Sequence, residues 1–126
     1  MNQHDFEAIT INEDESSAEG YKVLSSGEQL TNWFEKRGFT APTYEKTVML
    51  GFLNNLYVNE ADRNQGTGTY LVQEFIIECF DCDFIFLECD NEEVNEFDLK
   101  AWYEGFGFEV LYEADNPIMI LSKTQD

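Results

Sequence analysis

The chain has 126 residues, of which 43% are hydrophobic and 15% aromatic, and this argues for one folded domain over residues 1–126 and against intrinsic disorder. Its 26 acidic and 7 basic residues give a formal net charge of −19 at pH 7, which would repel duplex DNA and anionic membranes. We therefore expect no direct nucleic-acid partner and no membrane partner, and we expect attraction to cationic substrates or basic proteins.

Two periodicities predict the elements of secondary structure. Apolar and polar residues alternate in several short runs, which is typical of strands, while apolar stripes at helical spacing predict three helices. Ser26 is the expected cap of the first helix, and Gly51 is expected to break an apolar run into two hairpin-linked strands. In chain order we expect a strand at 6–11, a loop at 12–20, a strand at 21–24, a helix at 26–37, and strands at 43–50 and 53–58. We then expect a helix at 69–80, a strand at 84–89, a helix at 97–106, and strands at 108–112 and 118–122.

Strands and helices alternate in the second half of the chain, which predicts an α/β or α+β layer with at least one parallel strand pair. The N-terminus lacks the basic and apolar regions of a secretory signal, so a cytoplasmic location is expected. The cysteines are Cys79, Cys82 and Cys89, and His4 is the only histidine. A metal or redox site would need further ligands or an activating group, so we predict buried, reduced thiols and no metal.

A glycine turn separates the expected 53–58 strand from the 69–80 helix. Residues 63–68 read Arg-Asn-Gln-Gly-Thr-Gly. A strand that leads through such a turn into a helix presents free backbone N–H groups, which bind phosphate well. A plain turn is the alternative, with Arg63 in a surface ion pair with Glu60 or Asp62. A phosphate-loop nucleotide module is disfavoured because no Lys-Ser/Thr pair follows the turn.

The turn resembles the Arg/Gln-x-x-Gly-x-Gly/Ala signature of the GCN5-related N-acetyltransferases (GNATs), and it follows a Leu-Tyr-Val strand end as that signature usually does. A second block, Trp-Tyr-Glu-Gly-Phe-Gly-Phe at 102–108, is similar to the family's Tyr-x-x-x-Gly-Phe helix end. One expected helix and one expected strand lie between the blocks. The resemblance covers roughly residues 47–122.

The resemblance implies a mixed, centrally splayed β-sheet flanked by helices. The N-terminal half is shortened, because one helix is expected where the family commonly has two, so the acceptor site would be open or completed by the partner in a possible homodimer. Acetyl-CoA would be the co-substrate, with its pantetheine arm between the strands at 53–58 and 84–89. An asparagine that the family often has is replaced by Glu96, with Asn95 one residue away. The implied cofactor-binding residues are Leu56, Tyr57, Val58, Arg63, Asn64, Gln65, Gly66, Thr67, Gly68, Thr69 and Asn95.

The resemblance also implies transfer of an acetyl group to a primary amine. Tyr103 matches the tyrosine that protonates the departing thiolate, and backbone N–H groups at Leu56 or Val58 would stabilise the developing oxyanion. No motif assigns a base. Glu88, at the end of the 84–89 strand, is the candidate proton relay, with Asp90 and Glu60 as alternatives.

The acidic composition favours a cationic acceptor, such as a protein lysine, a polyamine or a basic small molecule. Asn54, Asn55 and Tyr57 are polar side chains that could face it. Two readings stay open. Tyr103 could be only a packed core aromatic, and the chain could be a catalytically silent, acidic binding protein for a basic partner such as a nucleic-acid-binding protein.

Overall fold

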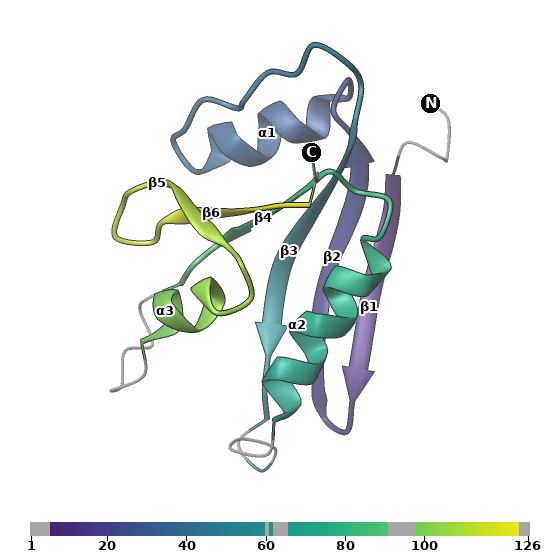
Figure 1. Cartoon of the computed structure of the whole chain (residues 1–126), viewed down its shortest axis with the longest axis vertical. Coiled ribbons are helices and arrows are strands. Elements are labelled where there is room, and N and C mark those ends of the chain that lie inside the picture. The colour runs from purple at the N-terminus through teal and green to yellow at the C-terminus, as the bar shows by residue number, and fades with distance from the viewer. Residues whose placement is uncertain (1–5, 60, 62–65, 91–97, 124–126) are drawn as a thin grey trace.

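A computed structural model describes residues 6–59, 61, 66–90 and 98–123 (Figure 1). Its six strands form one sheet in the order β1-β2-β3-β4-β6-β5. The β3–β4 pair is parallel and the other pairs are antiparallel, which confirms the mixed α+β class. The elements are β1 (Phe6–Glu13), β2 (Ser16–Leu24), α1 (Glu28–Lys36), β3 (Met49–Tyr57), α2 (Thr67–Glu78), β4 (Phe84–Glu88), α3 (Leu99–Glu104), β5 (Glu109–Tyr112) and β6 (Ile118–Ser122).

The helices cover opposite faces of the sheet, and each face has its own apolar cluster. Helix α1 packs on one face, while α2 and α3 pack on the other. All three cysteines are buried and free, as the sequence predicts. None of the described helices is long and apolar enough to span a membrane. The α1 face centres on Leu30, Trp33, Phe34, Phe52 and Phe86, and the α2 face on Leu53, Leu71, Phe75, Leu87 and Tyr103.

The predicted loop at 12–20 is wrong, because this stretch completes a β-hairpin. Strand β1 continues to Glu13 and β2 begins at Ser16, with Glu13 paired to Ser16. Asp14 allows the tight turn by adopting a left-handed conformation with φ of 57°, which aspartate tolerates better than most residues. Only the β1 part of this stretch lies at an edge of the sheet, because β2 pairs with both β1 and β3.

The predicted break at Gly51 is also wrong, since β3 runs unbroken from Met49 to Tyr57 and residues 43–48 form no strand. A methyl group on Gly51 would lie 2.7 Å from Cys79 Sγ, so glycine here admits the end of α2 close to the sheet. The predicted Ser26 cap is wrong as well, because the N-cap of α1 is Gly27 and has no side-chain hydrogen bond.

Two lysines fix the C-terminus of α2. Lys22 Nζ donates to the Glu78 carbonyl at 3.1 Å and to Asp81 Oδ1 at 3.0 Å. Lys123 Nζ donates to the Cys79 carbonyl at 2.8 Å. Carbonyls at a helix C-terminus lack intrahelical partners and carry partial negative charge, so both ammonium groups stabilise this end. Two of the seven basic residues thereby hold α2 against the sheet.

Strands β3 and β4 separate halfway along β3, as Figure 1 shows. They pair from Leu50↔Phe84 to Leu53↔Leu87, after which β3 continues along β2 as far as Tyr57 and β4 along β6. Gly20 of β2 pairs with Leu53 while Glu19 pairs with Asn55, so Asn54 is an extra residue in a β-bulge. The predicted central splay is therefore confirmed.

We expect Gly20→Ala to destabilise the fold by about 1 to 3 kcal/mol, because its methyl group would overpack the bulge. That group would overlap the Phe52 carbonyl oxygen and lie 2.7 Å from the Phe75 ring. The measurement is the urea midpoint of unfolding. Glu19→Ala, at the exposed neighbouring position, is the control and should stay within about 0.5 kcal/mol of the parent protein. Equal midpoints for the two variants would contradict the close packing.

Candidate functional site

The N-terminus of α2 presents backbone N–H groups at the splayed end of the sheet. Gly66 is its N-cap, with a left-handed φ of 80°. No side chain among the described residues caps this helix start, and its first turn contains no acidic residue. Thr67, Gly68 and Thr69 form that first turn, whose amides have no intrahelical partner. In a chain with this many acids, an uncapped helix start without a carboxylate is suited to an anion.

The two sequence blocks of the predicted site meet at Gly68. A methyl group there would lie 3.4 Å from Val58 Cγ2 and 3.5 Å from the Trp102 ring, so the start of α2 is packed between the end of β3 and helix α3. Asn59 fixes the segment that follows β3, since its N–H donates to Ser16 Oγ at 2.8 Å and its Oδ1 accepts from Ala61 N–H at 2.9 Å.

Beyond Leu53, the edge of β3 that faces β4 has no partner strand within the described parts of the chain. Leu56 is half-buried on the α2 face, and Tyr57 is 49% exposed. Val58 also packs against the α2 face. Four predicted cofactor residues, Arg63, Asn64, Gln65 and Asn95, lie outside the described residues.

Tyr103 is placed on the α2 face, near the end of β4, and is 6% exposed. Its ring lies 5.1 Å from that of Trp102 and 5.9 Å from that of Phe108. Burial raises the pKa of the phenol, and the charges of the Asp90 carboxylate and of Cys89, once that thiol ionises at high pH, raise it further. The phenol therefore stays protonated at neutral pH, as a proton donor must. Its burial also agrees with the alternative reading of a packed core aromatic.

Glu88 ends β4 and contacts α1 on the opposite face of the sheet. Arg37 Nε donates to its Oε1 at 3.0 Å. Arg37 also donates to the Trp33 carbonyl at 2.8 Å, and its guanidinium lies 4.0 Å from the centre of the Trp33 ring. Trp33 Nε1 in turn donates to Asn54 Oδ1 at 2.8 Å. We call these four residues (Asn54, Trp33, Arg37 and Glu88) the α1 bridge.

Sequence reasoning missed Arg37 and the α1 bridge. The only local signal was the four-residue spacing from Trp33 to Arg37, which places both on one side of a helix. Glu88 lies 51 residues further along the chain, and no pattern in the sequence reports a pairing over that distance.

The sequence matches no protein-family model and no curated protein, but solved structures do match. NAA60 from Arabidopsis thaliana, crystallised with a bisubstrate analogue, superposes with a TM-score of 0.58 and 13% identity, covering 98% of this chain and 79% of that one. The Escherichia coli ribosomal-protein-S18-alanine N-acetyltransferase superposes with a TM-score of 0.53 and 16% identity, and the match covers 99% of this chain and 74% of that one. The chain has the GNAT fold.

PH1933 from Pyrococcus horikoshii matches with a TM-score of 0.54 and 17% identity over 90% of this chain, which spans only 63% of the PH1933 chain. At these identities the likeness establishes the GNAT fold alone. The predicted shortening of the N-terminal half is confirmed, because a single helix, α1, lies between β2 and β3 and residues 37–48 form no second one.

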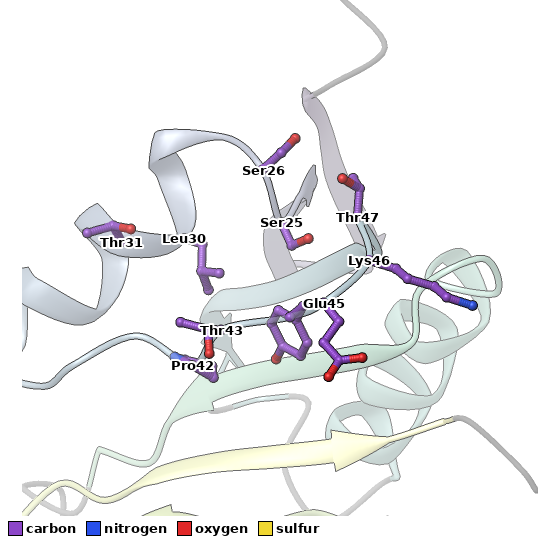
Figure 2. A pocket seen from close by; sticks show the side chains of 10 residues that line it. Ser25, Ser26, Leu30, Thr31, Pro42, Thr43, Glu45, Lys46 and Thr47 are labelled. Carbon is purple, nitrogen blue, oxygen red and sulfur yellow. The ribbon is translucent and has the colours of Figure 1, made fainter.

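A polar pocket of about 290 Å³ lies at the other end of β3 (Figure 2). It opens between α1 and the segment before β3, near Met49, roughly 20 Å along the strand from Leu56. Its lining mixes Glu45 and Lys46 with hydroxyl groups. Ser25 Oγ there already accepts the Val48 N–H at 3.0 Å. In this GNAT fold the pocket is remote from the splay and from Tyr103. Its lining residues are Ser25, Ser26, Leu30, Thr31, Pro42, Thr43, Tyr44, Glu45, Lys46 and Thr47.

The raised pKa of Tyr103 predicts a loss of stability at alkaline pH. A tyrosine in the unfolded chain ionises near pH 10, whereas the buried phenol holds its proton to higher pH, so its contribution is complete below about pH 10 and declines above it. Urea unfolding from about pH 8 to about pH 11 should therefore show a weaker decline in Tyr103→Phe than in the parent protein. Tyr70→Phe, which removes an exposed phenol, is the control. Identical slopes for the parent and Tyr103→Phe would contradict the burial effect.

Proposed function

We propose that this chain is an acetyl-CoA-dependent N-acetyltransferase that acetylates a primary amine. The observation that carries the proposal is the juxtaposition of two features at one end of the sheet. One is the edge of β3 after Leu53, which pairs with no other described strand, and the other is the start of α2 at Gly66, which no described side chain caps. The GNAT fold supports it. One matching structure holds a bisubstrate analogue, and another is an N-acetyltransferase of an alanine on a ribosomal protein.

The described residues suit the two halves of coenzyme A. The amides from Gly66 to Thr69 would bind the pyrophosphate, with Arg63 as a further cationic contact. The pantetheine arm carries amide groups that can pair with a strand edge, and β3 offers such an edge around Leu56 and Tyr57. Gly68 lets the first turn of α2 pack against Val58 and Trp102, which holds these amides beside the end of β3. Asn95 remains a proposed contact.

Acetyl-CoA would supply an acyl group activated as a thioester, which a neutral amine can attack. A free alkylamine has a pKa of about 10, so its ammonium form must lose a proton first. The Glu88 carboxylate on the α1 face would relay that proton to solvent. Tyr103 on the opposite face would protonate the sulfur as the C–S bond breaks. As the amide forms, its nitrogen would give up a second proton, which would restore the Tyr103 phenol. The net products are the amide, the free thiol and one released proton.

The acceptor would be cationic and would approach from the α1 face. Net charge of −19 attracts a protein lysine, a polyamine or a basic small molecule by long-range electrostatics. The single helix α1 leaves this side less covered than two helices would. Asn54, Asn55 and Tyr57, all exposed, would supply polar contacts there.

Acetyl-CoA binding is testable with two matched glycines. Gly66 and Gly38 have positive φ of 80° and 87°, and an added methyl group meets no atom within 4 Å at either. Alanine at either position should therefore lower stability similarly, by about 1 kcal/mol. Acetyl-CoA at 100 times its Kd should stabilise the parent and Gly38→Ala by about 2.7 kcal/mol, and Gly66→Ala clearly less. A melting curve of the parent that acetyl-CoA leaves unmoved would refute the proposed binding.

Catalysis is testable by release of free thiol from acetyl-CoA with a panel of amines and basic peptides. Tyr103→Phe should lower kcat on the order of 100-fold, as expected for loss of a general acid. Tyr44→Phe is the control, because Tyr44 stacks on Phe84 with ring centres 5.3 Å apart, beside the remote pocket. Undiminished turnover in Tyr103→Phe would remove its proposed role. Acetyl-CoA binding without turnover on any amine, together with salt-sensitive complexes with basic proteins, would favour the silent binding protein instead.

A further inference from the structure

Helix α1 connects the two strands that separate at the proposed site, and the connection ends on the candidate proton relay. We propose, on the basis of the proposed function, that Arg37 is a positioning residue that orients the Glu88 carboxylate toward the acceptor amine. The inference rests on the α1 bridge, whose contacts run from the bulge of β3 through α1 to the end of β4.

The first part of the α1 bridge fixes α1 to β3. Asn54 is the extra residue of the bulge, and its Oδ1 accepts the Trp33 indole N–H at 2.8 Å. Trp33 is 4% exposed, and its ring lies 4.9 Å from the Phe52 ring and 5.0 Å from the Phe34 ring, between ring centres. A bulge commonly redirects a side chain next to a functional site, and here it supplies the anchor for Trp33.

The second part fixes the guanidinium of Arg37. Its Nη1 donates to the Trp33 carbonyl at 2.8 Å, and the group lies over the Trp33 ring at 4.0 Å. A guanidinium is planar, and stacking on a ring fixes its orientation. A lysine ammonium at the same place would be less restricted. Arg37 Nε also donates to Glu88 Oε1 at 3.0 Å. Because the guanidinium is held in place, this hydrogen bond fixes the orientation of the Glu88 carboxylate.

Glu88 has one oxygen held and one oxygen available. Oε1 is taken by Arg37, while Oε2 has no hydrogen-bond partner within the described parts of the chain. The side chains of Arg37 and Glu88 are 23% and 35% exposed, so the ion pair is partly sheltered and still open to solvent. An ammonium group entering from the α1 face can reach Oε2, and water beyond it can take the proton.

This geometry is more than a stabilising surface pair would require. An exposed pair typically contributes less than about 1 kcal/mol and would leave turnover unchanged if broken. A carboxylate held by Arg37 reaches the amine in one orientation, and small losses of alignment reduce rates strongly. Breaking the pair should therefore lower kcat while acetyl-CoA, which would bind on the α2 side, binds as before.

The experiment is a double-mutant cycle with Arg37→Gln, Glu88→Gln and the double variant, using thiol release with the best amine of the panel. We expect Arg37→Gln to lower kcat on the order of tenfold, with an unchanged Kd for acetyl-CoA. In the Glu88→Gln background the same substitution should change kcat by less than about twofold, because the carboxylate it positions is gone. Arg37→Lys should recover part of kcat, since it restores a donor without the fork.

Lys36→Gln is the matched control, because it removes an exposed charge from the adjacent position of α1 and should leave kcat unchanged. Losses from Arg37→Gln and Glu88→Gln that simply multiply, or a kcat for Arg37→Gln equal to that of Lys36→Gln, would overturn the positioning role while the proposed acetyltransferase stands. Absence of turnover in the parent protein would instead overturn the proposed function, and this inference with it. If Arg37→Gln does not fold, Arg37→Lys in the two Glu88 backgrounds decides the question by the same criterion.

Discussion

The separation of β3 from β4 after Leu53 is the constraint on which the rest of the structure depends. Parallel pairing stops there although both strands continue with other partners. Among the described strands, one edge in the middle of the sheet is therefore left without a partner, where edges are normally paired. The bulge at Asn54 and the close approach of Gly20 to Phe52 and Phe75 hold β3 on its separate course. The proposed coenzyme site, the placement of Tyr103 and the α1 bridge all follow from this opening.

Nearby groups, and not the net charge of −19, determine the electrostatic field at the start of α2. The start of α2 has no acidic residue in its first turn, while Lys22 and Lys123 neutralise the carbonyls at its other end. Amides in direct contact with a phosphate act at hydrogen-bond distance, whereas charges beyond about 8 Å are largely screened at physiological salt. An acidic surface that attracts a cationic acceptor is therefore compatible with an anion site at one helix start.

Local patterns predicted the second half of the fold well. The periodicity of α2, the apolar run of β4, and the strands β5 and β6 are local features that neighbouring residues determine. The errors arose where contacts distant in sequence decide the structure. Gly51 lies inside β3, where it pairs with β2 and β4 and where Cys79 leaves no room for a side chain. The polar 12–20 stretch forms strands because it pairs with itself and with β3. The α1 bridge was missed for the same reason.

In the complex that we propose, coenzyme A occupies the opening between β3 and β4, with its pyrophosphate on the first turn of α2. An amide chemical-shift titration of isotope-labelled protein with coenzyme A tests it most directly, because it reports each backbone N–H separately. We expect the largest shifts at Gly66, Thr67, Gly68 and Thr69, and along β3 from Asn54 to Tyr57. Shifts confined to the polar pocket around Ser25 and Thr47, or no shifts at saturating ligand, would contradict it.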